Sequence, residues 1–223
     1  MKLKTLGSGS SGNCYLLTDN DGKTLILDAG VKTDVIKKAL NYDFMNVDAA
    51  LITHNHKDHS LSADALEMYG VGVFKPYLIE GGRDRRTFGK YAVSAFPVEH
   101  DNEPCCGFYI KHLDGLRMLY LTDLSLCKWT FKKQEVQVIL VEVNYQKEYL
   151  DLQQEQYQHK VRGHFSLENC LEFLKANKTD ALQKVIICHQ SIWTMDEREC
   201  IERIRQEVGV DVFAAGKGKV VDL

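Results

Sequence analysis

The sequence predicts an α/β fold, and three observations support this prediction. Short apolar runs typical of β-strands alternate along the chain with segments that have helical periodicity. No linker interrupts this series, so residues 1–223 are expected to form a single domain. Strand-like runs repeatedly end at polar side chains that can bind ligands: Asp28, His54, His100, Asp123 and His189.

The composition is that of a soluble globular protein. Of the 223 residues, 44% are hydrophobic and 26% are charged, which is enough apolar material for a substantial core. The net charge of −3 argues against a protein held to nucleic acid by bulk charge alone. It does not exclude an enzyme that recognises phosphate locally.

The sequence also predicts a cytoplasmic location without membrane attachment. No apolar stretch approaches the length of a membrane span, and the N-terminal residues do not resemble a signal peptide. The seven cysteines form an odd set without a CxxC pair. Reduced thiols in the cytosol explain this pattern better than a disulfide framework.

The first part of the chain contains five expected strands and two expected helices. The turn Asp19-Asn20-Asp21-Gly22 predicts a hairpin, and Ser62 is a candidate N-cap. The polar and basic segment 80–90 has no clear pattern. The strands are expected at 2–6, 14–18, 24–28, 47–53 and 71–77, and the helices at 32–40 and 62–69.

The second part continues the same alternation. Asp114-Gly115 predicts another hairpin, and Ser166 is a candidate N-cap. Strands are expected at 91–98, 107–111, 116–122, 136–143, 185–188, 210–214 and 219–221, and helices at 166–176 and 196–208.

The segment His54-Asn55-His56-Lys57-Asp58-His59 carries the strongest chemical signal. It supplies three imidazoles and one carboxylate, which suit zinc and related divalent ions. Its close spacing lets one loop present two groups to one ion and two to another. A polar surface loop with chance histidines is the alternative, but the density of ligands favours a metal site.

This segment resembles the HxHxDH signature of the metallo-β-lactamase superfamily. Asp28, in LILDAG, is similar to the upstream structural aspartate of that family. VEHD, LTDL and ICHQS place His100, Asp123 and His189 in the family's order. The resemblance runs from about Gly7 to the C-terminus and implies an αββα four-layer sandwich, with metal ions at one edge.

The resemblance also implies a two-metal site, with zinc favoured and manganese as the alternative. Asp123 would bridge the ions, and Asp58 would both bind metal and orient a water molecule that the metals activate. Cys188 would point into the core, away from its neighbour His189. One metal would be held by His54, His56 and His100, and the other by Asp58, His59 and His189.

Further motifs narrow the expected substrate. GSGSSGN at 7–13, HD at 100–101, TDL at 122–124 and GHFSLEN at 163–169 together resemble a bacterial branch of double-stranded DNA exonucleases and phosphodiesterases. The expected activity is therefore hydrolysis of DNA or another nucleotide phosphodiester. His164 is a candidate to protonate the leaving alkoxide or hold a phosphate oxygen, although it could be a surface residue ahead of a helix.

Other functions of the same site remain open. One rival is an acyl ester, lactone or thioester hydrolase, and another is a non-catalytic, metal-stabilised module that binds nucleic acid. The segments 142–145, 147–162 and 189–191 depart from the branch, which leaves the metal site intact but the precise substrate open.

Several residues outside the motifs have two interpretations. The loop 7–13 could bind an anion or simply form a turn. Asn144 and Tyr145 follow a strand and could line the site, although Tyr145 could equally pack. The remaining residues are interpreted as non-functional. A solvated surface is favoured for the basic cluster Arg83, Arg85, Arg86 and Lys90, packing for Trp129 and Phe131, and surface positions for His112 and His159.

Overall fold

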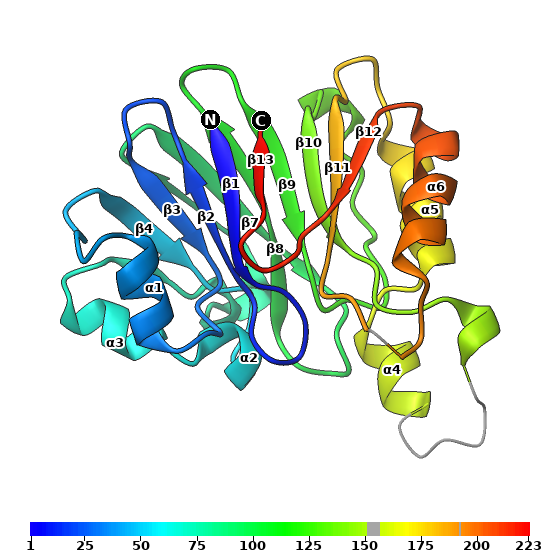
Figure 1. Cartoon of the computed structure of the whole chain (residues 1–223), viewed down its shortest axis with the longest axis horizontal. Helices are drawn as coiled ribbons and strands as arrows, with labels where there is room; N and C mark the ends of the chain where they lie inside the picture. Colours follow the sequence, from blue (N-terminus) through cyan, green and yellow to red (C-terminus); the bar gives the residue numbers. More distant parts are fainter. Residues whose placement is uncertain (151–156, 192) are drawn as a thin grey trace.

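Two β-sheets pack face to face between two layers of helices (Figure 1). This computed structural model describes residues 1–150, 157–191 and 193–223, without the side chain of His159. The arrangement is the expected αββα sandwich.

The first sheet has six strands in the order β13-β1-β2-β3-β4-β5. The predicted hairpin at residues 19–22 joins β2 and β3, which pair antiparallel, while β3, β4 and β5 are parallel. The strands are β1 (Lys2–Gly7), β2 (Cys14–Thr18), β3 (Thr24–Leu27), β4 (Val47–Leu51), β5 (Val73–Phe74) and β13 (Val220–Asp222).

The second sheet has seven strands in the order β12-β11-β10-β9-β8-β7-β6. Strands β9 to β12 are parallel, so their carboxyl ends meet at one edge of the sheet. The hairpin predicted at Asp114-Gly115 joins β8 and β9. The strands are β6 (Asp84–Phe88), β7 (Tyr91–Val98), β8 (Cys105–His112), β9 (Arg117–Leu121), β10 (Val138–Glu142), β11 (Lys184–Cys188) and β12 (Asp211–Ala214).

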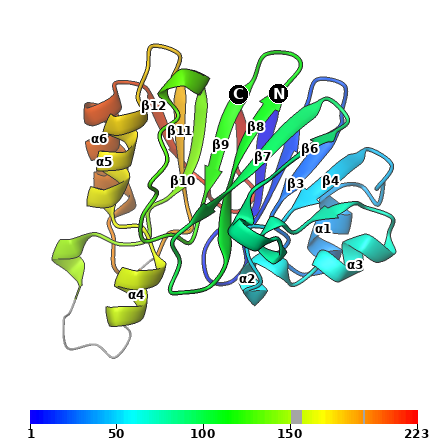
Figure 2. The same cartoon turned by 180° about the vertical axis from the view of Figure 1, so that it is seen from behind.

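Helices cover the outer faces of both sheets, as the view from behind also shows (Figure 2). The first sheet carries α1 (Thr33–Ala39) and α3 (Ala63–Met68), and the second carries α5 (Leu167–Asn177) and α6 (Glu197–Val208). Two short helices, α2 (Lys57–Ser60) and α4 (Tyr157–Gly163), lie near the carboxyl ends of the parallel strands. Short 3-10 helices span Pro76–Leu78, Glu80–Gly82, Lys132–Gln134 and Lys147–Tyr149.

The sheets share a buried apolar layer. Leu27 and Leu51 of the first sheet belong to the same cluster as Tyr120, Leu140 and Ile186 of the second. Each fully buried aliphatic side chain stabilises the fold by roughly 1.5–3 kcal/mol relative to exposure. This shared layer fixes the position of one sheet relative to the other.

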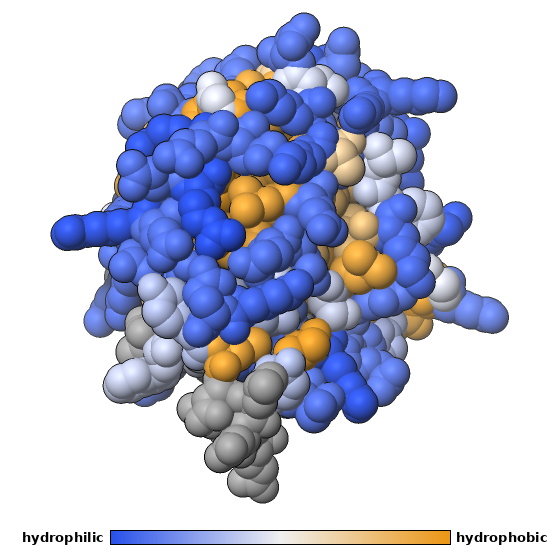
Figure 3. All heavy atoms as spheres, turned by 90° about the vertical axis from the view of Figure 1, so that its right-hand side faces the viewer, coloured by the Kyte–Doolittle hydropathy of each residue, from blue (hydrophilic) through white to orange (hydrophobic). Residues whose placement is uncertain are grey.

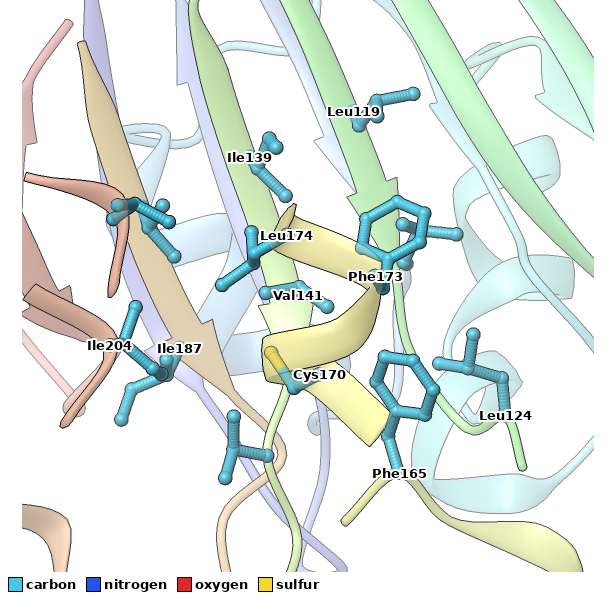
Figure 4. Close-up of a cluster of buried hydrophobic side chains, with 14 of the residues drawn as sticks. Leu119, Leu124, Ile139, Val141, Phe165, Cys170, Phe173, Leu174, Ile187 and Ile204 are labelled. Atoms are coloured by element: carbon cyan, nitrogen blue, oxygen red, sulfur yellow. The ribbon is translucent and has the colours of Figure 1, made fainter. Parts of the chain in front are cut away.

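A second cluster lies between the seven-stranded sheet and the helices α5 and α6 (Figure 4). Leu174 and Cys170 of α5 pack against Val141 and Ile187 of the sheet, and Ile204 of α6 joins them. The outer surface of this layer is mostly hydrophilic, with scattered apolar patches (Figure 3). Among the described residues, no helix combines the length and apolar character needed to span a membrane.

The sequence-based assignments were wrong or incomplete at four places. The segment 80–90 contains strand β6, and the strand expected at 71–77 is only Val73–Phe74. Ser166 caps α5 by accepting a hydrogen bond from the Asn169 N–H at 3.1 Å. Ser62 occupies the predicted N-cap position of α3 but makes no side-chain cap bond, and its hydroxyl donates to the Val31 carbonyl. The short helices α2 and α4 were not predicted.

His112 was expected at the surface, and this expectation was wrong. The imidazole of His112, the last residue of β8, is buried, and its Nε2 lies 3.3 Å from Oδ2 of the buried Asp19. Its ring stacks at a tilt against Tyr91, at a centroid distance of 4.6 Å. His112 therefore stabilises the contact between the strands, away from the site. The side chain of His159, which was also expected at the surface, lies outside the described residues.

Candidate metal centre

Polar side chains from both sheets converge where the strands end. His54 follows β4, His100 follows β7, Asp123 follows β9 and His189 follows β11. His56, Asp58 and His59 come from the turn that leads into α2 and from α2 itself. All seven predicted site residues of this series therefore meet at one edge.

Three of the strand-end residues adopt left-handed backbone conformations. The φ angles of Asp28, Asp123 and His189 are 55°, 48° and 48°. A non-glycine residue with positive φ is uncommon and must be stabilised by its surroundings. At these positions the left-handed conformation turns the chain sharply out of the sheet as the strand ends.

The seven converging residues fall into two groups that share one carboxylate, and a third group, of Asp123, Glu142, His164 and His189, overlaps them. In each group the candidate ligand atoms lie within 4.8 Å of one another, and Asp123 is common to all three. The first group is His54, His56, His100 and Asp123, and the second is Asp58, His59, Asp123 and His189. This is the division that the sequence resemblance implied.

The side chains of the two groups are crowded and leave a buried nitrogen without a partner among the described residues, as expected at a metal site. The Nε2 atom of His54 is buried and has no hydrogen-bond partner in the described part of the chain. The ring of His54 lies 4.3–4.8 Å, between centroids, from those of His56, His59 and His100. Crowded imidazoles with an unsatisfied nitrogen would be costly in a dry core, whereas a divalent cation would satisfy them.

The local electrostatics favour the metal-binding protonation states of His54 and Asp123. Burial lowers the pKa of His54 well below its ordinary value, and the neighbouring His59 adds to this effect. Burial alone would raise the pKa of Asp123, but the facing His189 and His59 hold it well below its usual range. A neutral imidazole and an ionised carboxylate are the ligand forms. Burial alone would lower the pKa of His59 and of His189, but the facing Asp123 raises both, so a bound cation would have to displace their protons.

A buried network around Asp28 orients His59. The Asp28 carboxylate accepts hydrogen bonds from the Thr53 N–H at 2.8 Å and from the Tyr120 hydroxyl at 2.5 Å, and its Oδ2 lies 2.7 Å from Nδ1 of His59. With Nδ1 engaged, Nε2 of His59 faces the group. His100 is held similarly, because its Nδ1 lies 2.7 Å from the Gly163 carbonyl oxygen. Such outer contacts fix ring orientation and tautomer.

The loop Gly7–Asn13 packs against the signature segment. A Cβ at Gly30 would lie 1.7 Å from the Asp58 carbonyl oxygen, and one at Gly12, whose φ is 133°, would lie 2.4 Å from the Gly30 carbonyl oxygen. The Asn13 N–H donates to that same Asp58 carbonyl at 2.7 Å. The two glycines allow this close backbone approach, which fixes the position of Asp58.

Glu142 is a site residue that the sequence did not reveal. It is completely buried at the end of β10, and one carboxylate oxygen lies 2.7 Å from Nδ1 of His164 and 3.2 Å from Nδ1 of His189. Its other oxygen accepts hydrogen bonds from the N–H groups of Leu124 and Phe165. The sequence signal for Glu142 was a carboxylate at the end of an otherwise apolar strand.

Five of the seven candidate ligands line a cavity of about 1020 Å³: His56, Asp58, His100, Asp123 and His189. His164 lies in this cavity, with its ring centroid 5.1 Å from that of His189. Further wall residues that the sequence did not single out are Lys160, Ser191 and Trp193, while Ser10 and Ser11 come from the Gly-Ser loop. The cavity is therefore polar, with most of the candidate metal ligands in its wall.

Asn144 also lines the cavity, whereas the remaining ambiguous residues lie outside it. Tyr145 is buried and packs, and Phe131 packs against Phe96 at a centroid distance of 4.8 Å. Arg83 stacks on Trp129 at 4.4 Å, which places this arginine on a surface away from the site. Cys188 lies in the core between the sheets, as expected.

These layers, with the histidine and aspartate groups at their common edge, define a protein of the metallo-β-lactamase fold. The family model described as "Metallo-beta-lactamase superfamily" matches residues 7–67, which include Asp28 and the whole segment from His54 to His59. The predicted resemblance to this superfamily is confirmed.

The chain has distant relatives along most of its length. It is 25% identical to the exodeoxyribonuclease YycJ of Bacillus anthracis, over 96% of this chain and 93% of that protein. It is 27% identical to the exodeoxyribonuclease WalJ of Streptococcus pneumoniae, over 85% of this chain and 81% of that protein. The metallo-β-lactamase fold protein YhfI of Bacillus subtilis superposes with a TM-score of 0.72 at 16% identity, covering 99% and 98% of the two chains. Together, fold, clusters and relatives support a hydrolase that depends on divalent metal ions.

Proposed function

We propose that this protein is a two-metal phosphodiesterase that hydrolyses DNA. The observation that carries the proposal is the pair of ligand groups sharing Asp123, which suits two adjacent cations. Both curated relatives described above are named exodeoxyribonucleases, and each alignment covers most of both chains. These relatives favour a DNA phosphodiester over an acyl ester, lactone or thioester. The packing of both sheets on one apolar layer supports a single domain over residues 1–223.

We assign the ligands to two ions. The nitrogen-rich first group suits zinc, and manganese is the alternative for the more carboxylate-rich second group. When bound, the cations would lower the pKa of a water molecule and neutralise the charge that develops on the phosphoryl oxygens. His54, His56 and His100 would hold the first ion, Asp58, His59 and His189 would hold the second, and Asp123 belongs to both groups.

Asp58 is the more exposed of the two aspartates that join the ligand groups and line the cavity. Its side chain is 24% exposed, whereas that of Asp123 is 3% exposed. Its Oδ2 lies 3.4 Å from Nε2 of His59. We assign Asp58 the orientation of the attacking water by hydrogen bonding, in addition to its role as a ligand.

His164 is assigned the protonation of the leaving alkoxide. Glu142 contacts its Nδ1 at 2.7 Å, and a buried carboxylate at this position fixes the orientation of the imidazole. The Nε2 atom can then donate its proton to an oxygen in the cavity. The departing sugar oxygen gains the proton that Nε2 of His164 gives up.

The proposal is tested by incubating purified protein, supplied separately with zinc and manganese, with end-labelled double-stranded DNA. The wild type is expected to cleave the DNA, and Asp58→Ala is expected to lose cleavage. Asp64→Ala is the matched control, because Asp64 is an aspartate on the exposed side of α3, with its side chain 92% exposed. No cleavage with either metal, while metal is bound in stoichiometric amount, would contradict the DNA phosphodiesterase. Turnover of acyl esters, lactones or thioesters would then support the rival hydrolase, and DNA binding without any turnover would support the non-catalytic module.

A further inference from the structure

One wall of the cavity contains a basic side chain that neither the ligand groups nor the assigned catalytic residues use. Lys160 of α4 donates hydrogen bonds from Nζ to the Ser191 hydroxyl at 3.1 Å and to the Thr194 hydroxyl at 2.6 Å. Both partners are neutral. Burial lowers the pKa of Lys160, and no carboxylate of the described residues counteracts this effect. An anion entering the cavity would supply the missing negative charge.

The loop after β11 holds an indole at the rim of the same cavity. Trp193 is 85% exposed, although its neighbour Thr194 is buried. The Thr194 carbonyl accepts a hydrogen bond from the Gln146 N–H at 2.8 Å, and the Gln146 side chain accepts one from the Asp196 N–H at 2.6 Å. The exposed indole therefore stands on an anchored backbone rather than on an unsupported loop.

Trp193 also stands between two hollows. It lines the cavity of about 1020 Å³ and an adjoining hollow of about 580 Å³, whose wall includes Tyr149 and Met195. In both ribbon views, α4 lies beside the carboxyl ends of the strands (Figures 1 and 2). The arrangement places an ammonium group inside the cavity and an aromatic face at its mouth.

A site for single-stranded nucleic acid combines a cationic side chain with an exposed aromatic ring, and Lys160 and Trp193 supply these two elements in one cavity. The cation contacts the backbone phosphate, and the aromatic ring stacks on a base. A base inside a duplex is already stacked on both faces, so the indole can stack only on an unpaired or terminal base.

We propose that Lys160, Ser191 and Trp193 form a subsite for an unpaired nucleotide adjacent to the scissile phosphodiester. Lys160 contacts the phosphate of this nucleotide, Ser191 orients the ammonium group, and Trp193 stacks on the base. The inference rests on the proposed phosphodiesterase function and specifies its substrate as a DNA end with unpaired nucleotides.

The inference is tested by equilibrium binding, so that it does not depend on turnover. The probes are two short duplexes of phosphorothioate DNA, which resists cleavage; one has a single-stranded tail and the other has blunt ends. Each carries an internal fluorophore, and binding to the zinc-loaded protein is followed by fluorescence anisotropy. The wild type is expected to bind the tailed duplex about tenfold more tightly than the blunt one, because stacking of one base contributes this much.

The variants separate the two elements of the subsite. Trp193→Ala is expected to abolish the preference for the tail, and Trp193→Phe to restore most of it. Lys160→Met is expected to weaken binding of the tailed duplex and to reduce the slope of log K against log salt by about one. Leu113→Ala and Lys178→Met are the matched controls, because both residues are exposed and belong to neither hollow.

The outcomes distinguish this inference from the proposed function. Equal binding of tailed and blunt duplexes by the wild type, or an unchanged preference in Trp193→Ala, would overturn the subsite. Cleavage of DNA by the same preparation would in that case leave the phosphodiesterase standing. Absence of DNA cleavage by metal-loaded protein would instead refute the proposed function, and with it the assignment of this wall to a nuclease substrate.

Discussion

The Nδ1 atom of His59 lies 2.7 Å from Oδ2 of Asp28, and both side chains are completely buried. Asp28 does not belong to either ligand group, yet it determines which nitrogen of His59 faces them. A carboxylate in this position makes an imidazole a stronger ligand and holds its ring in place. The pair therefore connects the backbone turn after β3 to the affinity of the proposed metal site.

Replacement of Asp28 is expected to weaken metal binding without removing a ligand. Asp28→Asn removes the negative charge behind His59, and loss of such an outer contact reduces metal affinity about tenfold to a hundredfold. The measurement is competition with a chromophoric zinc chelator. Asp34→Asn is the control, because the side chain of Asp34 is 82% exposed. Wild-type affinity in Asp28→Asn would show that the contact does not support the metal site.

Removal of metal is expected to lower thermal stability. A cation that binds only the folded state at a hundredfold excess over its Kd stabilises it by about 2.7 kcal/mol, which corresponds to roughly 5–10 °C in Tm for a chain of this size. The crowded imidazoles around His54 give the physical reason. Calorimetry with and without a chelator measures the shift.

The double variant His56→Ala, His59→Ala provides the control for this shift. It is expected to contain less than stoichiometric metal and to show the same Tm with and without chelator. An unchanged Tm for the wild type after verified removal of its metal would contradict a stabilising role of the ions.

The proton donor assigned to His164 predicts a dependence on the leaving group. His164→Ala is expected to reduce kcat on DNA by about a hundredfold or more, because an alkoxide leaves poorly without protonation. The loss is expected to be much smaller for bis(p-nitrophenyl) phosphate, whose phenolate leaves unaided. Metal content, measured in parallel, is expected to stay at the wild-type level. Equal losses on both substrates would indicate a positioning role instead.

The cysteines are expected to be unreactive in the folded protein. All seven are free, and burial raises the pKa of Cys106 to about 12 and that of Cys127 to about 11. At pH 8 these thiols are protonated, and the thiolate is the reactive form. Mass spectrometry after treatment with iodoacetamide is expected to find slow modification, beginning at the partly exposed Cys127, and seven modifications after unfolding in denaturant. Rapid modification of several native cysteines would contradict the buried positions.

The sequence revealed those site residues that are close together in the chain or that directly follow an apolar strand-like run. His54, His56, Asp58 and His59 form one dense segment, and Asp123 ends an apolar run. Glu142 escaped notice because it follows an apolar run as a single carboxylate, and only the parallel pairing of β10 with its neighbours places it beside His164. Contacts of this kind depend on strand order, which local patterns do not contain.

Local patterns also failed where tertiary contacts override them. Strand β6 carries Asp84, Arg85 and Arg86, which is unusual for a strand but common at a sheet edge, where charges prevent further pairing. His112 was assigned to the surface because it lies outside the motifs. In the fold it contacts Asp19, which lies in the turn between β2 and β3 of the other sheet and is far away in the sequence. Lys160 and Trp193 show the same limit, since only the folded chain brings them to one cavity.

The most direct test of the two-metal site is anomalous diffraction at the zinc absorption edge from crystals of the zinc-loaded protein. Two peaks are expected, one beside His54, His56 and His100 and the other beside Asp58, His59 and His189, with the Asp123 carboxylate contacting both. A single peak, or peaks that do not share Asp123, would contradict the proposed two-metal phosphodiesterase.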